Sequence, residues 1–227
     1  MQGFPLKIAV FASGGGSNAQ AIADAIRGGK LNARIGLCVS NKIDAGVLTR
    51  MEELEIPTLV LDPRDFPSED LYTEHLLHEL AENEINFIAL AGYLRRVPTA
   101  VVRRFKNRIL NIHPALLPSF GGKGYYGRRV HEAVLECGVK WTGVTVHLVD
   151  EEYDTGPIVL QQPVAVEPDD TPETLAARVL EVEHKVYPEA IGLFAEGRVV
   201  VDGRRVIVTP VQGAGCTTDC PPPRGGG

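Results

Sequence analysis

Three groups of polar residues in this 227-residue chain have the types and spacing that a binding or catalytic site requires. The first is Ser13-Gly14-Gly15-Gly16-Ser17-Asn18, which follows a short apolar run. Glycines let backbone N–H groups approach an anion, Ser17 and Asn18 add side-chain donors, and a helix that starts here adds partial positive charge. The segment lacks the Gly-Lys-Ser/Thr of a Walker A loop. We predict a phosphate site here, with a tight turn of small packing residues as the alternative.

The second group is Asn111-Ile112-His113-Pro114, which reads as the end of an apolar strand. Along a strand Asn111 and His113 project to the same side. An amide donor can hold a developing oxyanion while a nearby imidazole moves a proton. The alternative is a capping asparagine and a packed histidine, which is the commoner origin of an arbitrary Asn-x-His pair.

The third group runs from His147 to Asp154 and holds four carboxylates within five residues. Such a cluster is typical of a solvated turn between strands. One of its carboxylates can instead orient a histidine and support its charge. The residues by themselves leave both interpretations open.

Short apolar runs alternate with helical patterns in the first half of the chain, which predicts a parallel sheet with right-handed crossovers. The glycine-rich turn then lies at the carboxyl edge, where ligands bind in such sheets. Two later runs alternate polar and apolar residues, as antiparallel or mixed strands do. We expect an α/β fold: a doubly wound, mostly parallel sheet with helices on both faces and mixed strands in its C-terminal part. The expected strands are 7–12, 33–39, 58–61, 87–91, 108–112, 142–149 and 157–166, the helices 19–26, 45–54, 68–84, 99–105, 129–136 and 171–196, and a terminal hairpin 199–208.

The composition narrows the class of protein. Lys and Arg number 23 and Asp and Glu 29, and the net charge of −6 argues against a broad nucleic-acid surface. No apolar run approaches the roughly 18–20 residues that span a bilayer, and the first residues lack a secretory signal, so we expect a cytoplasmic protein without a membrane partner. We expect one α/β domain at residues 1–210 and a disordered Gly/Pro-rich tail at 211–227, which contains Cys216 and Cys220.

Several motifs together resemble the phosphoribosylglycinamide formyltransferase family of purine synthesis. Their order and spacing match from about Lys7 to Val208, and the combination is far more specific than any one motif. The resemblance implies transfer of a formyl group from 10-formyltetrahydrofolate to the amine of glycinamide ribonucleotide, with no metal. The motifs are Ser13–Asn18, Leu90–Arg95, Asn111–Ser119, Gly143–His147 and Asp154–Pro157.

The resemblance also implies roles for particular residues. The ribonucleotide phosphate is expected on Gly15, Gly16, Ser17 and Asn18, and the glycinamide part against Glu183. His113 is expected to act as general acid and base, Asn111 as the oxyanion donor, and Asp154 to orient His113 and favour its charged form. The folate is expected to contact Leu94, Arg95, Arg96, Val97, Asn111 and Asp150.

Two features depart from the family pattern: Glu69 stands where relatives have arginine, and the loop at residues 121–129 differs in composition.

Two other functions are weighed against the formyl transfer. Formyltetrahydrofolate hydrolase would carry an additional N-terminal domain. A non-catalytic nucleotide- or folate-binding module has no need of Asn111, His113 and Asp154 together. The expected partners are the two small substrates, and the sequence leaves monomer and homodimer open.

Overall fold

A computed structural model describes residues 5–210 of the protein. The predicted disordered tail at residues 211–227, with Cys216 and Cys220, lies outside the described residues. Within the described part, no helix has both the length and the apolar character needed to cross a membrane.

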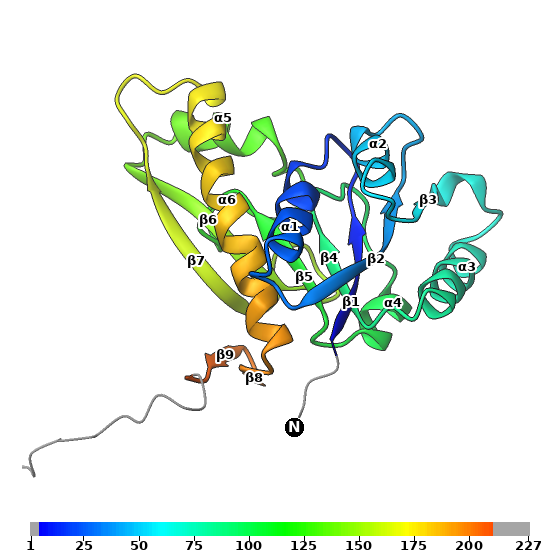
Figure 1. The fold of residues 1–227 in the computed structure, drawn as a ribbon. Coiled ribbons are helices and arrows are strands. Elements are labelled where there is room, and N and C mark those ends of the chain that lie inside the picture. The colour runs from blue at the N-terminus through cyan, green and yellow to red at the C-terminus, as the bar shows by residue number, and fades with distance from the viewer. Residues whose placement is uncertain (1–4, 211–227) are drawn as a thin grey trace, which may run out of the picture.

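Seven strands of the described chain form one sheet. They are β1 (Leu6–Phe11), β2 (Ala33–Ser40), β3 (Thr58–Val60), β4 (Phe87–Leu90), β5 (Ile109–His113), β6 (Trp141–Leu148) and β7 (Ile158–Ala165). Their order across the sheet is β3-β2-β1-β4-β5-β6-β7 (Figure 1). Neighbours from β3 to β5 run parallel, whereas β6 pairs antiparallel with both β5 and β7. The predicted mostly parallel sheet with mixed strands at its C-terminal end is confirmed.

Helices cover both faces of the sheet, and each face has its own apolar core. They are α1 (Ser17–Arg27), α2 (Gly46–Glu52), α3 (Glu69–Glu82), α4 (Thr99–Arg104), α5 (Arg128–Glu136) and α6 (Pro172–Ala195). In β1, Val10 packs in the core under α1, α2, α5 and α6, and Phe11 in the core under α3 and α4. Successive residues of a strand point to opposite faces, so a strand buried on both faces is apolar throughout.

Local sequence sets the helix ends. Ser68 Oγ accepts a hydrogen bond from Leu71 N and caps α3. Thr171 and Thr174 exchange bonds in a capping box at the start of α6, with proline at the first helical position. A 3₁₀ turn at Pro63–Asp65 was not predicted. The chain ends its described part in the expected hairpin, β8 (Val199–Asp202) and β9 (Arg205–Val208).

The strand order reverses between β1 and β4, and ligands bind at such switch points in open α/β sheets. Ser13 joins the loops that leave these two strands: its N–H donates to Gly92 O at 3.1 Å, and its Oγ accepts from Leu94 N at 2.9 Å. Ser13 Oγ also donates to Asn41 Oδ1, at the end of β2, at 2.5 Å. The loops at the switch point are therefore linked to one another by hydrogen bonds.

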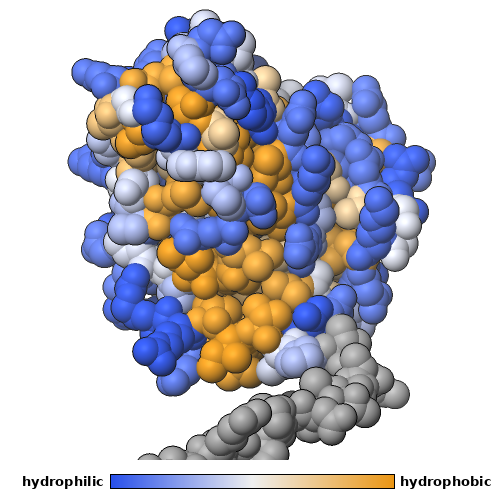
Figure 2. All heavy atoms as spheres, turned by 90° about the vertical axis from the view of Figure 1, so that its left-hand side faces the viewer, coloured by the Kyte–Doolittle hydropathy of each residue, from blue (hydrophilic) through white to orange (hydrophobic). Residues whose placement is uncertain are grey.

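The antiparallel strands lie on the other side of β5. β6 pairs with β5 so that Asn111 stands opposite His147 and His113 opposite Thr145. β7 forms the outer edge of the sheet, and apolar residues gather over this side of the molecule (Figure 2). The buried Tyr187 hydroxyl of α6 lies 2.9 Å from Leu90 O and 3.0 Å from Leu110 O, which fixes this helix against β4 and β5.

Candidate active site

The glycine loop after β1 is shaped for close backbone contacts. Gly16 is the N-cap of α1 and has φ 75°, in the left-handed region that glycine adopts without strain. A Cβ atom at Gly16 would lie 2.5 Å from Val47 Cγ2 on α2, so only glycine fits here. Gly14 and Gly15 are exposed. The chain therefore turns sharply into α1 and leaves the loop open beside the helix N-terminus.

The carbonyl groups of this loop form hydrogen bonds with the protein, whereas its N–H groups remain without such bonds. The carbonyl oxygens of Gly14, Gly15 and Gly16 all accept hydrogen bonds from other residues. The N–H groups of these glycines make no hydrogen bond with any residue from 5 to 210. The N–H groups of the first turn of α1 have no partner within their helix either. Free backbone donors at a helix N-terminus are what the predicted phosphate site needs.

Asn18 and Glu183 form a buried pair that joins α1 to α6. Asn18 Nδ2 donates to Glu183 Oε2 at 2.6 Å, across 165 positions of sequence. Burial raises the pKa of Glu183 to about 6, although the bond from Asn18 acts in the opposite direction. Asn18 Oδ1 is buried without a partner among the described residues. The Asn18 side chain thus contacts α6, which the glycine motif did not indicate, and the Asn18 N–H remains for an anion.

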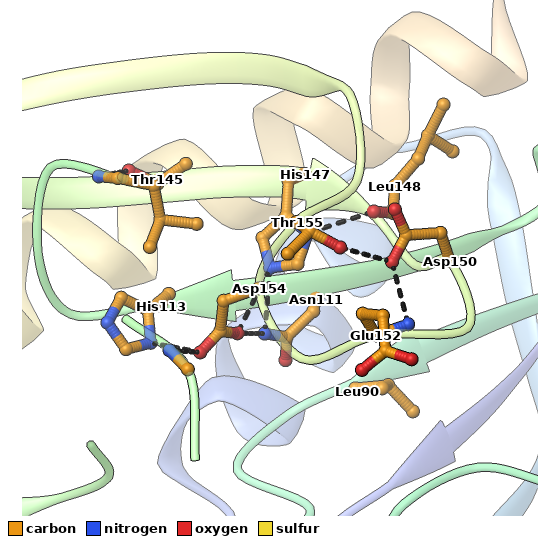
Figure 3. Close-up of polar contacts among 12 residues, drawn as sticks. Leu90, Asn111, His113, Thr145, His147, Leu148, Asp150, Glu152, Asp154 and Thr155 are labelled. Carbon is orange, nitrogen blue, oxygen red and sulfur yellow. Dashed lines mark hydrogen bonds and ion pairs between the residues drawn. The ribbon is translucent and has the colours of Figure 1, made fainter. Parts of the chain in front are cut away.

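The structure brings Asn111, His113 and Asp154 together (Figure 3). Asn111 Nδ2 lies 3.3 Å from Asp154 Oδ1, and His113 Nδ1 lies 3.7 Å from Asp154 Oδ2. A fourth residue joins them, since His147 Nε2 lies 3.0 Å from Asn111 Nδ2 and 3.5 Å from Asp154 Oδ1. Figure 3 shows the Asp154 carboxylate between His113 on one side and Asn111 with His147 on the other. We call these four residues the catalytic cluster.

Two acceptors flank the buried imidazole of His113. Nε2 lies 2.8 Å from Phe120 O, so Nε2 carries the ring hydrogen, and Nδ1 keeps its lone pair when the ring is neutral. Burial lowers the pKa of His113 by more than the Asp154 charge and the Phe120 carbonyl raise it. Asp154 therefore acts in the predicted direction. Burial opposes the charged form of His113, and its effect on the pKa is larger than that of the carboxylate.

Both amide hydrogens of Asn111 are used within the catalytic cluster. His147 Nδ1 donates to Leu148 O at 2.8 Å, which leaves His147 Nε2 as an acceptor. Asn111 Nδ2 then donates to His147 Nε2 and to Asp154 Oδ1. An oxyanion that binds Asn111 must replace one of these two acceptors.

A turn in the acidic loop places the Asp154 carboxylate. Asp154 has φ 56°, in the left-handed region that Asp adopts more readily than most residues. A Cβ atom at Gly156 would overlap Leu148 O, so the turn needs glycine there. Gly122 N donates to Asp154 Oδ2 at 2.8 Å. Burial raises the pKa of Asp154, but the contacts with His147, His113 and Gly122 together hold it below its ordinary value, so the carboxylate is charged at neutral pH.

A cavity of about 310 Å³ opens beside the catalytic cluster, within the size range of small-molecule sites. The predicted folate segment, residues 94–97, forms one wall, the acidic loop at 149–154 forms a second, and residues 122–127 line the cavity as well. Arg96 Nη2 donates to Glu151 O at 2.6 Å, and Arg103 Nε donates to Glu151 Oε1 at 2.9 Å, so the two walls are held together. Asp150 Oδ1 accepts from Thr155 Oγ1 at 2.7 Å and folds the acidic loop on itself.

The other predicted folate residues have distinct surroundings. Val97 is buried, and Leu94 is half exposed at the cavity. Arg95 Nη2 lies 3.7 Å from the buried Asp62, whose pKa is lowered to about 2 chiefly by hydrogen bonds from Arg64. Arg64 is thus occupied by Asp62 and does not line the cavity.

Glu69, the departure from the family pattern, is exposed in the first turn of α3 and is not part of the cavity lining. A carboxylate at this position is favoured by the helix dipole. The carboxylate of Glu69 is therefore compatible with the start of α3 and is not among the residues that line the cavity.

The contacts of three further residues of the site are visible only in the structure. The sequence leaves His147 open between a supported histidine and a satisfied strand histidine, and its register with β5 shows that it contacts Asn111. The buried Thr145 donates to Ala115 O at 2.7 Å and accepts from Leu117 N at 3.0 Å, which shapes the turn after His113. Arg103 lies in the last turn of α4, and its bond to Glu151 joins this helix to the acidic loop. Within residues 5–210, no three His, Cys, Asp or Glu side chains are grouped as metal ligands.

The sequence pattern of the formyl transferase family matches residues 6–191, so this chain belongs to that family, as the motifs predict. Similar relatives are phosphoribosylglycinamide formyltransferases. The chloroplastic protein of Arabidopsis thaliana is 48% identical over 194 residues, 85% of this chain. The protein of Bacillus subtilis (strain 168) is 38% identical over 185 residues, 82% of this chain. The crystal structure of glycinamide ribonucleotide transformylase 1 from Symbiobacterium toebii has a TM-score of 0.86 and 42% identity, over 91% of this chain and 95% of that one.

The relatives differ in length. This chain spans 66% of the Arabidopsis protein, just under two thirds, and 92% of the Bacillus protein.

Proposed function

We propose that this chain transfers a formyl group from 10-formyltetrahydrofolate to the amine of N1-(5-phospho-D-ribosyl)glycinamide, giving formylglycinamide ribonucleotide in purine biosynthesis. One observation carries the proposal: the carboxyl ends of three neighbouring strands carry the parts of one site. β1 leads into the open glycine loop and β4 into the cavity wall at residues 94–97. Asn111 and His113 lie at the end of β5. A phosphate-bearing acceptor and a folate donor can therefore reach the same reacting groups.

The ribonucleotide is assigned to the β1 side. Its phosphate accepts hydrogen bonds from the free N–H groups of Gly15, Gly16 and Asn18 and from the Ser17 hydroxyl. The loop carbonyls are already bonded, which leaves mainly donors for the anion. Glu183 faces the same end of α1 through Asn18 and supplies a carboxylate for the glycinamide part.

The folate is assigned to the cavity of about 310 Å³. Its pterin and formyl end lie between residues 94–97 and the acidic loop that contains Asp150, with the formyl oxygen towards Asn111. Leu94 supplies an apolar surface and Arg95 and Arg96 supply cations. The cavity lining and the family motifs support this assignment.

The catalytic cluster suits attack of an amine on a formyl carbon. The amine nitrogen forms a bond to the formyl carbon, and negative charge collects on the formyl oxygen, where Asn111 donates a hydrogen bond. Neutral His113 accepts the proton of the attacking nitrogen at Nδ1, and the charged Asp154 stabilises the resulting imidazolium. The bond from the formyl carbon to folate N10 then breaks, and His113 returns the proton to the departing nitrogen.

A single assay separates the proposal from its rivals. Purified protein is given 10-formyltetrahydrofolate with and without the ribonucleotide, and both folate deformylation and formylated ribonucleotide are measured. Formylated product that requires the acceptor supports the proposal. Deformylation at the same rate without the acceptor supports the hydrolase, and binding of both ligands without turnover supports the non-catalytic module.

The remaining parts of the proposal concern the domain, its partners and its location. We assign residues 1–210 to one formyltransferase domain whose partners are the two small substrates. A cytoplasmic location, a monomeric or homodimeric state and the lack of a resident metal stay predictions.

A further inference from the structure

The glycine loop is held from outside by α2. Val47 N donates to Gly14 O at 3.0 Å, and Arg50 Nε donates to Gly15 O at 2.7 Å. The third carbonyl, of Gly16, accepts from Gln20 N of α1 at 2.9 Å. Figure 1 shows α2 beside the loop that joins β1 to α1. α2 therefore engages two of the three loop carbonyls.

These bonds also determine where the N–H groups of the loop point. In a trans peptide the C=O and the N–H lie on opposite sides of the chain. The bond from Val47 to Gly14 O therefore turns Gly15 N–H away from α2, and the bond from Arg50 to Gly15 O does the same for Gly16 N–H. A backbone that lacks either bond can rotate, because glycine has the widest conformational freedom.

Arg50 is the one side chain among these donors, and it has no other hydrogen bond or ion pair within residues 5–210. It is exposed and lines a surface groove together with Ser17 and Lys185. Its bond to Gly15 O places a cation beside the glycine loop, and no carboxylate of residues 5–210 forms an ion pair with it. Its contact with Gly15 links α2 to the loop across 35 positions of sequence.

We propose that Arg50 is a positioning residue for the ribonucleotide phosphate: its Nε–H holds the Gly15 carbonyl so that Gly16 N–H faces the anion. The proposal rests on the proposed function, since it assumes that the loop binds a phosphate. It assigns Arg50 to the affinity for the ribonucleotide and not to the chemistry of formyl transfer or to folate binding.

Two uncharged variants of similar length test the hydrogen bond. In Arg50→Gln, an amide N–H stands at the place of Arg50 Nε along the side chain, and in Arg50→Met a methyl group stands there. Loss of one such bond is expected to raise the Kd and KM for the ribonucleotide about tenfold in Arg50→Met, with kcat and the KM for the folate almost unchanged. Arg50→Gln should stay within about threefold of the unmodified protein, since it keeps a neutral donor.

The measurements are calorimetric titration with N1-(5-phospho-D-ribosyl)glycinamide, steady-state kinetics and thermal melting. Lys185→Met is the matched control, because it removes a cation from the same groove without touching the loop. Equal losses in Arg50→Gln and Arg50→Met overturn the proposal, and so does wild-type affinity in Arg50→Met. Failure of the unmodified protein to bind the ribonucleotide contradicts the proposed function itself, which separates the two failures.

Discussion

The glycine loop and the catalytic cluster are built in opposite ways. The loop is one short segment that offers backbone N–H groups, and its carbonyls are bonded by neighbouring helices. The cluster consists of side chains from β5, β6 and the acidic loop, joined across 36 and 43 positions of sequence. The loop should therefore depend on its backbone and on the glycines that keep it open, whereas the cluster should fail on loss of a single side chain.

The two regions also differ in their charge. The catalytic cluster holds a charged carboxylate beside a histidine that burial keeps neutral. The loop region holds a buried carboxyl, Glu183, with a pKa of about 6 and an amide as its hydrogen-bond partner. A change of pH near neutrality therefore alters the charge of Glu183 in the loop region.

The largest expected effect is in the catalytic cluster. His113→Ala should lower kcat about 10²–10⁴-fold, because the proton acceptor is lost, while ribonucleotide binding persists. Steady-state kinetics and calorimetry measure the two effects. His75→Ala, at an exposed histidine of α3, is the control. Unchanged turnover in His113→Ala would remove this residue from the mechanism.

Asp154→Asn removes the charge of the carboxylate together with one of its two acceptor oxygens. The carboxylate raises the pKa of His113, so its loss should lower that pKa further and weaken the base. We expect kcat to fall about 10–10²-fold and the acidic limb of its pH profile to move to lower pH. A limb that stays in place, or moves to higher pH, contradicts the assigned pair of His113 and Asp154.

Gly15→Val and Gly16→Val separate binding from folding in the loop. A Cβ atom at Gly15 meets no protein atom within 4 Å, whereas at Gly16 it meets Val47 and a left-handed φ. Gly15→Val should weaken ribonucleotide binding about 10-fold or more, by blocking N–H groups, with little change in melting temperature or folate affinity. Gly16→Val should lower stability itself, so loss of both ligands in that variant indicates a folding defect. Wild-type ribonucleotide affinity in Gly15→Val places the phosphate elsewhere.

The smallest expected effect is that of the Glu183 charge on the free energy of unfolding. Its folded pKa is raised from 4.5 to about 6, so its ionisation costs folding free energy as the pH rises through this window. Glu183→Gln keeps the shape without the charge and should raise the free energy of unfolding by about 2 kcal/mol above pH 7, and by almost nothing below about pH 4.5. Urea unfolding at both pH values measures this. A gain that does not depend on pH argues against a buried charge.

The elements of the fold were predictable because their signals are local. The strand at Leu6–Phe11 is apolar apart from Lys7, and the caps at Ser68 and Thr171 use side chains within three residues of the helix start. The 3₁₀ turn at Pro63–Asp65 was missed because a single short turn has no periodicity. The sequence predicted a mostly parallel sheet with mixed strands in its C-terminal part. It predicted neither the order of the strands nor the register of their pairs.

The sites were predictable to different degrees for the same reason. The glycine loop is contiguous, so its residue types show its chemistry. The contacts of His147 and Arg103 could not be predicted, because they depend on the register of β6 with β5 and on a contact between α4 and the acidic loop. The net pKa of His113 was also out of reach, because burial decides its direction and burial is a property of the packed molecule.

By itself, the sequence determined the strands, the helices, the glycine loop and the family, since apolar periodicity, caps and motifs act over a few neighbouring residues. Tertiary structure alone decided that Asp154 lies between two histidines, that Asn18 faces Glu183 and that Arg50 holds Gly15. These contacts join residues far apart in the chain, and their distances, burial and charge states arise only when the sheet and its helices are packed together.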